Sequence, residues 1–145
     1  MLLDPSHVLS AALDAVAPST VNAVAPAAVQ PHLPIRGGLP PSVLRRVREY
    51  IEAHLGENIS LQVLAGIAGK SVHHFARSFK QSEGLTAHEY LVQRRVRRAQ
   101  ELLAYTDLPL SEIALASGFS DQSHCARRFR ERVGLTPSRY RWSMR

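Results

Sequence analysis

The sequence of 145 residues is poor in cysteine and has no long hydrophobic run. One cysteine, Cys125, excludes an intrachain disulfide and a zinc site built from cysteine pairs. The most apolar stretch, residues 8–29, is interrupted by Asp14 and by prolines, so we predict no transmembrane helix. Because no basic residue precedes Arg36, we also expect no secretory signal, no membrane partner and a cytoplasmic location.

Motifs of catalysis and metal binding are missing as well. We find no nucleophile motif, no glycine-rich phosphate loop and no convergent carboxylates. The seven histidines include the neighbours His73 and His74, which point to different helix faces, and no H-E-x-x-H spacing occurs. We therefore predict no metal site, no cofactor and no enzymatic activity.

Basic charge is the most unusual property of the chain, and it is unevenly distributed. Residues 1–35 contain two acidic residues and no basic one. Residues 36–145 contain all 18 basic residues, almost all arginine, and the other 10 acidic ones, a net charge of +8. This charge favours a polyanionic partner, and nucleic acid over an anionic membrane surface.

Proline separates a tail from the rest of the chain. Seven of the nine prolines lie in residues 1–41, where they prevent long helices. We expect residues 1–39 to form a flexible Ala/Pro-rich tail. The alternative is a short segment that binds a partner.

From residue 40 onward the apolar spacing is helical, which predicts an all-α domain of about seven helices. In the first helix Leu44, Val47, Ile51 and Leu55 form one apolar stripe, and Gly56 is expected to end the helix. Further boundaries are predicted from the capping residues Ser60, Ser71, Thr86, Ser120 and Thr136 and from glycines 69, 84, 118 and 134. We predict a first helix-turn-helix at about 60–84, a linker helix at about 86–104 and a second helix-turn-helix at about 109–134.

The two predicted motifs are copies of each other. Residues 71–90 align with residues 121–140 at an offset of 50, with eight identities in 20 positions. The preceding helices align at an offset of 49, so one residue, Phe119 in this alignment, is extra in the second copy. We interpret this as a duplication of one helix-turn-helix plan.

In each copy the second helix has a basic and polar face. In the first copy Val72, Phe75 and Phe79 are expected to face inward. The opposite face presents His73, Ala76, Arg77 and Lys80 in the first copy, and Ser123, Ala126, Arg127 and Arg130, with Gln122 and Arg128 beside them, in the second. Arginine and glutamine suit base edges, whereas Lys80, Arg128 and Arg130 suit phosphates. A solvated face is the simpler interpretation of one such helix, but not of two copies on a +8 domain.

A linker helix of about 19 residues is about 28 Å long, close to the ~34 Å between successive major-groove faces. A monomer with this linker can therefore contact two adjacent major grooves. On the linker itself, Arg94, Arg95, Arg97 and Arg98 form either a phosphate-contacting patch or a solvated face paired with Glu101.

Residues 41–145 resemble the DNA-binding domain of AraC/XylS-type transcriptional regulators. The matching segments are Leu61-Gln-Val-Leu-Ala65, Ser71-Val-His-His-Phe-Ala-Arg-Ser-Phe79, Gly118-Phe-Ser-Asp-Gln-Ser-His124 and Gly134-Leu-Thr-Pro-Ser-Arg-Tyr140. The resemblance implies two helix-turn-helix subdomains on double-stranded DNA and activation of transcription through RNA polymerase. It also implies DNA contacts by His73, Ala76 and Arg77, with Val72 as a further candidate, and by Gln122, Ser123 and Arg127. Cys125 stands where the family usually has Phe, and we expect a buried structural thiol there rather than a redox sensor.

Two further functions stay open from the sequence. One is a nucleoid-type protein that binds DNA without sequence preference, and the other is a protein-interaction adaptor that acts through the tail. The two basic faces differ in sequence, which favours a sequence-specific regulator because a packaging protein needs no second code.

Overall fold

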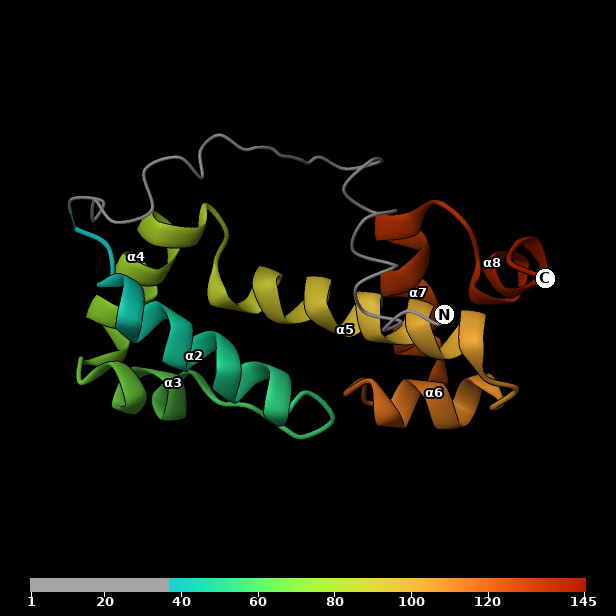
Figure 1. Ribbon diagram of the computed structural model, residues 1–145, viewed down its shortest axis with the longest axis horizontal. Coiled ribbons are helices and arrows are strands. Elements are labelled where there is room, and N and C mark those ends of the chain that lie inside the picture. The colour runs from blue at the N-terminus through green and yellow to red at the C-terminus, as the bar shows by residue number, and fades with distance from the viewer. Residues whose placement is uncertain (1–36) are drawn as a thin grey trace. The chain divides into compact units, whose positions relative to one another are not determined.

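The computed structural model describes residues 37–145, which form seven helices and no strand (Figure 1). The helices are α2 (Pro41–Ala53), α3 (Leu61–Ala68), α4 (Val72–Glu83), α5 (Ala87–Tyr105), α6 (Leu110–Ala116), α7 (Gln122–Val133) and α8 (Pro137–Ser143). The all-α prediction is confirmed. Most of the predicted tail lies outside the described residues. Within them, no helix combines the length and the apolar character needed to cross a membrane.

The chain divides into two compact units between Val92 and Gln93, inside α5. We call residues 37–92 the N-terminal unit and residues 93–145 the C-terminal unit. The first turns of α5 belong to the N-terminal unit and its remaining turns to the C-terminal unit. Each unit therefore contains one of the two predicted helix-turn-helix motifs.

Side-chain caps explain where most helices begin. The Ser60 hydroxyl accepts a hydrogen bond from the Val63 N–H at 3.2 Å, and the Ser71 hydroxyl accepts one from the His74 N–H at 3.1 Å. Before α5, the predicted cap Thr86 forms a reciprocal capping box with Glu89, with bonds of 2.9 and 3.1 Å.

Two predicted boundaries are wrong. Helix α7 is capped by Asp121 rather than Ser120, since the Asp121 carboxylate accepts from the His124 N–H at 2.8 Å. Helix α2 ends at Ala53, before Gly56. His54 occupies the C-cap position, and its backbone N–H donates to the carbonyls of Tyr50 and Ile51. The His54 ring lies 2.9 Å from the Tyr50 carbonyl through Nδ1 and stacks on the Tyr50 ring. A side chain thus replaces the glycine cap that the sequence predicts.

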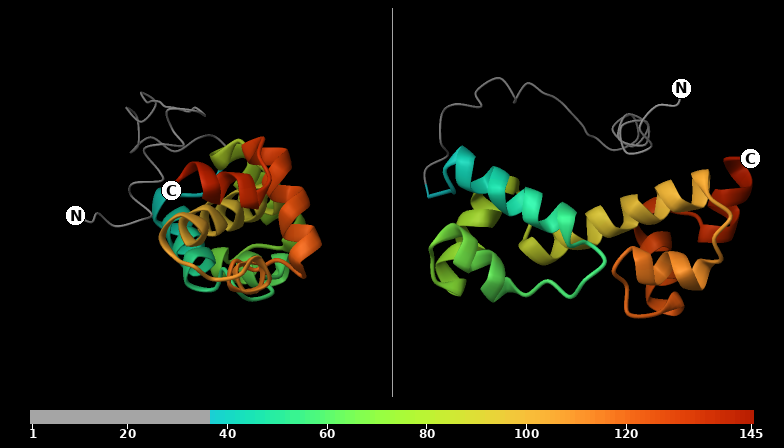
Figure 2. Two further views of the ribbon diagram at one scale, coloured as in Figure 1. Left: turned by 90° about the vertical axis from the view of Figure 1, so that its right-hand side faces the viewer. Right: turned by 60° about the horizontal axis from the view of Figure 1, so that its bottom comes forward.

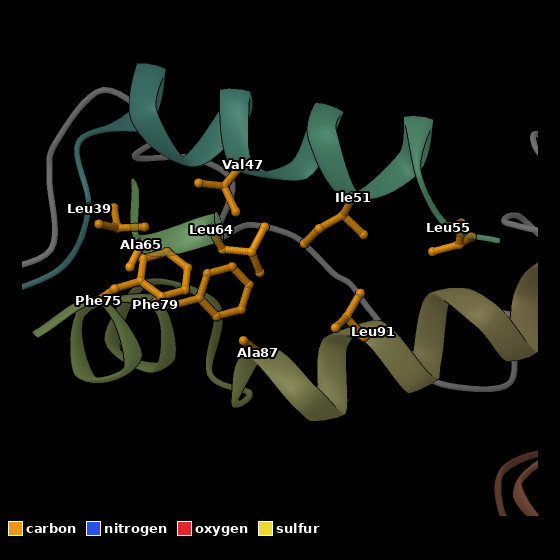
Figure 3. Packing of buried hydrophobic residues seen from close by; sticks show 10 residues of the cluster. All are labelled: Leu39, Val47, Ile51, Leu55, Leu64, Ala65, Phe75, Phe79, Ala87 and Leu91. Carbon is orange, nitrogen blue, oxygen red and sulfur yellow. The ribbon is translucent and has the colours of Figure 1, made fainter. Parts of the chain in front are cut away.

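The core of the N-terminal unit lies between α2 and the helix-turn-helix (Figure 3). Helix α2 packs along α3 (Figure 2) and points Val47 and Ile51 at the core. Phe75 and Phe79 are completely buried and hold α4 in place. The prediction that Val72 also faces inward is wrong, because 37% of this residue is exposed at the first turn of α4.

Backbone hydrogen bonds at the two turns locate the residue that differs between the copies. The Lys70 N–H donates to the Ala65 carbonyl at 3.0 Å, and the Phe119 N–H donates to the Ala114 carbonyl at 2.9 Å. Lys70 and Phe119 are therefore equivalent. The extra residue of the second copy is Ser120, not Phe119.

The aromatic contacts of the two units are also equivalent. Phe79 meets Tyr90 edge-on with ring centroids 5.6 Å apart, and Phe129 meets Tyr140 edge-on at 5.4 Å. In each pair the phenylalanine comes from the second helix of the motif and the tyrosine from the helix that follows. The duplication seen in the sequence is thus repeated in the packing.

Candidate nucleic-acid interface

Helix α4 presents the predicted basic residues on one side. His73, Arg77 and Lys80 are exposed and Ala76 is half-buried, whereas Phe75 and Phe79 anchor the opposite side. The four residues His73, Ala76, Arg77 and Lys80, which we call the α4 face, line a common surface hollow of about 580 Å³. The small Ala76 side chain leaves room in this hollow for a base edge or a sugar.

Gln81 and Thr86 also line this hollow, although neither was predicted from the sequence as a DNA contact. Gln81 follows Arg77 by four residues, so helical spacing is sufficient to identify it. Thr86 is different, because it reaches the hollow only through the turn at Gly84, where the backbone has φ 81°. No pattern in the linear sequence places that turn beside α4.

Helix α7 presents the equivalent residues Ser123, Ala126, Arg127 and Arg130, which we call the α7 face. Ser123, Arg127 and Arg130 are exposed, Ala126 is half-buried, and Gln122 is exposed at the start of the helix. Cys125 and Phe129 are fully buried on the other side. Burial raises the pKa of the Cys125 thiol to about 11, so the thiol is neutral at physiological pH.

Arg128 is not brought to the α7 face with the others. It lies one residue beyond Arg127, on the side of α7 that is turned towards α5, and it pairs with Glu131 at 3.2 Å. Helical spacing on α7 alone predicts Arg128 beside the DNA-contacting residues, because that spacing takes no account of α5.

His124 stabilises the turn before α7. Its Nδ1 lies 3.1 Å from the Ser120 hydroxyl, and its ring meets the Phe119 ring edge-on at 5.3 Å. Desolvation lowers the pKa of the His124 imidazole, and the positive charges of Arg127 and Arg128 lower it further. The ring is therefore a packed neutral group at pH 7. Within residues 37–145 no three histidine, cysteine or acidic side chains are grouped to hold a metal ion.

Two units, each with a short helix, a tight turn and a second helix that exposes a basic and polar face, define a helix-turn-helix protein. A family model described as a helix-turn-helix domain matches residues 64–143. The probable transcriptional regulator LumQ of Photobacterium leiognathi is 36% identical over 99 residues, which are 68% of this chain and 40% of LumQ. The chain thus spans less than half the length of this curated relative.

Solved structures have the same fold. The DNA-binding domain of AdpA, determined in complex with a target DNA, is 31% identical with a TM-score of 0.66, over 69% of this chain and 90% of that domain. An AraC-type regulator from Chromobacterium violaceum is 30% identical with a TM-score of 0.67, over 71% of this chain and 92% of that one. This chain belongs to the AraC-type helix-turn-helix family.

Proposed function

We propose that the chain is a sequence-specific DNA-binding transcriptional regulator that, as a monomer, inserts α4 and α7 into two adjacent major grooves. The observation that carries the proposal is the duplicated face, which combines exposed cations with a small central alanine in both units. The AdpA domain, which has the same fold, was crystallised on its target DNA. In this scheme residues 40–145 are the DNA-binding domain and residues 1–39 are a tail.

Each face contains one arginine suited to reading a base. Arg77 and Arg127 are equivalent in the two copies, are exposed, and have no ion-pair partner among the described residues. An unpaired guanidinium is free to form two parallel hydrogen bonds to the O6 and N7 of a guanine. We assign base contacts to these two arginines.

The neighbours of these arginines complete the assignment. His73, Gln122 and Ser123 lie at the exposed first turns of α4 and α7, and we assign them to base edges or sugars. Lys80 and Arg130 lie about one turn beyond Arg77 and Arg127, and we assign them to phosphates. The two faces therefore read different sequences with the same geometry.

A single continuous helix supports the two-groove scheme. Helix α5 has 19 residues and contributes to both units. At ~1.5 Å per residue it is about 28 Å long, which is close to one ~34 Å turn of B-DNA. One chain then performs the task that dimeric helix-turn-helix proteins divide between two subunits.

We further propose that the bound protein activates transcription through RNA polymerase, in the cytoplasm. The support is membership in a family whose relatives include proteins named as transcriptional regulators.

Selection of bound sites from random duplex DNA tests the proposal. We expect a recovered motif and a specificity ratio of about 10³ or more over random duplex at physiological salt. Recovery of no motif, with equal affinity for all duplexes and steep salt dependence, contradicts it and supports a nucleoid-type protein instead.

A further inference from the structure

A second basic surface lies on the C-terminal unit, on the side of α7 that is turned towards α5. A hollow of about 540 Å³ separates the two helices there. Its polar lining consists of Gln93, Arg97 and Gln100 from α5 and Arg128, Glu131 and Arg132 from α7. We call it the α5–α7 hollow.

The duplicated N-terminal unit shows what covers the same place in the other copy. At the offset of 50, Arg128 corresponds to Ser78 and Arg132 to Ser82. Ser78 is 2% exposed, and the Ser82 hydroxyl accepts a hydrogen bond from the Leu39 N–H at 2.7 Å. This side of α4 is therefore closed by the chain segment that precedes α2.

The C-terminal unit cannot close the hollow in the same way. In the N-terminal unit the chain bends at Pro40, just before α2, so that Leu39 is buried against α4. The helices that precede the two motifs, α2 and α5, end at Ala53 and at Tyr105, an offset of 52, so Leu39 corresponds to Leu91, which lies inside the continuous helix α5. Because this position lies within a helix, no equivalent segment of residues 37–145 folds back over α7, and the place is lined with arginine.

The lining of the hollow suits an anion. Three arginines and one glutamate give it a net charge of +2. Glu131 accepts a hydrogen bond from the Nη1 of Arg128 at 3.2 Å, but the Nε of Arg128 is buried without an acceptor in the part of the chain that the structure describes. A buried donor without an acceptor is unfavourable, and a ligand oxygen would satisfy it. Arg132 also has no ion pair among the described residues.

We propose that the α5–α7 hollow binds a small anion whose two or more negative charges are carried by phosphate or carboxylate groups. Its volume lies within the range of ~300–1,000 Å³ that is usual for small-molecule sites. Arginine forks bind both groups through paired, charge-assisted hydrogen bonds. The bound anion joins Arg97 on α5 to Arg128 and Arg132 on α7, so it braces the second recognition helix from the side that the α7 face does not use.

Calorimetric titration of the full chain without DNA tests this site. The probes are pyrophosphate and adenosine diphosphate for the phosphate class and citrate for the carboxylate class. We expect one of the two classes to bind with a stoichiometry of one. The double variant Arg128→Gln/Arg132→Gln should bind it about 100-fold more weakly, because it loses two charge-assisted contacts that are each worth about tenfold.

The matched control is Arg127→Gln/Arg130→Gln, which removes the same two charges from the other side of α7. We expect it to retain anion affinity to within about threefold, since exposed charges are screened over ~8 Å at physiological salt. The proposal is overturned if none of the three probes binds, or if the control loses as much affinity as the Arg128/Arg132 variant.

A third variant, Glu131→Gln, keeps the test decisive if the double variant fails to fold. Glu131 is the only carboxylate among the described residues that line the hollow. Its removal frees Arg128 and ends the repulsion between the carboxylate and the ligand, so anion affinity should rise severalfold. Unchanged or weaker binding contradicts the proposal. Because DNA is absent throughout, failure of this site is distinct from failure of the DNA-binding proposal.

Discussion

Arg127 and Arg128 are neighbours on one helix with the same charge, but we assign a base contact to Arg127 and none to Arg128. Arg127 is exposed on the α7 face, whereas Arg128 pairs with Glu131 on the side turned towards α5. If Arg127 reads a base, Arg127→Ala removes a bidentate contact worth about 1–3 kcal/mol. Affinity for a selected duplex should then fall about 5- to 150-fold.

Arg128→Ala removes the same charge from a partly exposed ion pair, which contributes about 0–1 kcal/mol. We expect a loss of no more than about fivefold, shared equally by selected and random duplexes. Fluorescence anisotropy at 150 mM salt, with both duplexes and both variants, measures the difference. Equal losses in the two variants, or a loss in Arg127→Ala that is independent of sequence, would refute the assignment of α7.

Three further predictions concern stability and reactivity. Asp121→Ala should lower the free energy of unfolding by about 1 kcal/mol in urea titration, because Asp121 accepts the hydrogen bond of the N-cap. Ser120→Ala should change it by less than about 0.5 kcal/mol. A larger effect of Ser120→Ala would show that Ser120 is the cap after all. Phe129→Ala should cost about 3–5 kcal/mol in the same assay, since this ring is fully buried against Tyr140, and a cost below ~1 kcal/mol would show that the core is not packed as described. The Cys125 thiol should react with iodoacetamide only slowly at pH 7–8, and its rate should rise about tenfold per pH unit up to a pKa near 11, because the thiolate is the reactive form; fast alkylation at pH 7 would contradict the burial.

Local features of the fold could be predicted from the sequence because their causes are local. The capping box of Thr86 and Glu89 requires only a spacing of three residues, and the burial of Val47 and Ile51 on one side of α2 requires only helical periodicity. The α4 face follows from the same periodicity once Phe79 is taken as buried.

Features that depend on another segment were not predicted. Arg128 and Arg127 are equally basic in the sequence, and only the position of α5 across the hollow from α7 distinguishes their surroundings. The end of α2 is a local feature that was still missed, because His54 contacts Tyr50 only four residues away and the prediction considered only the glycine. The cap of α7 could have been predicted from the alignment of the two copies, which places the cap Ser71 on Asp121. Ser120 was predicted instead because serine is a preferred N-cap residue.

The central claim is that two recognition helices of one chain read two different segments of DNA. Site selection from random duplex, repeated with Arg77→Ala and with Arg127→Ala, tests it most directly. We predict that each variant loses sequence preference in one segment only, that the two segments differ, and that their centres lie about one helical turn, ~10 base pairs, apart. Loss of preference in the same segment in both variants, or in neither, would contradict the claim.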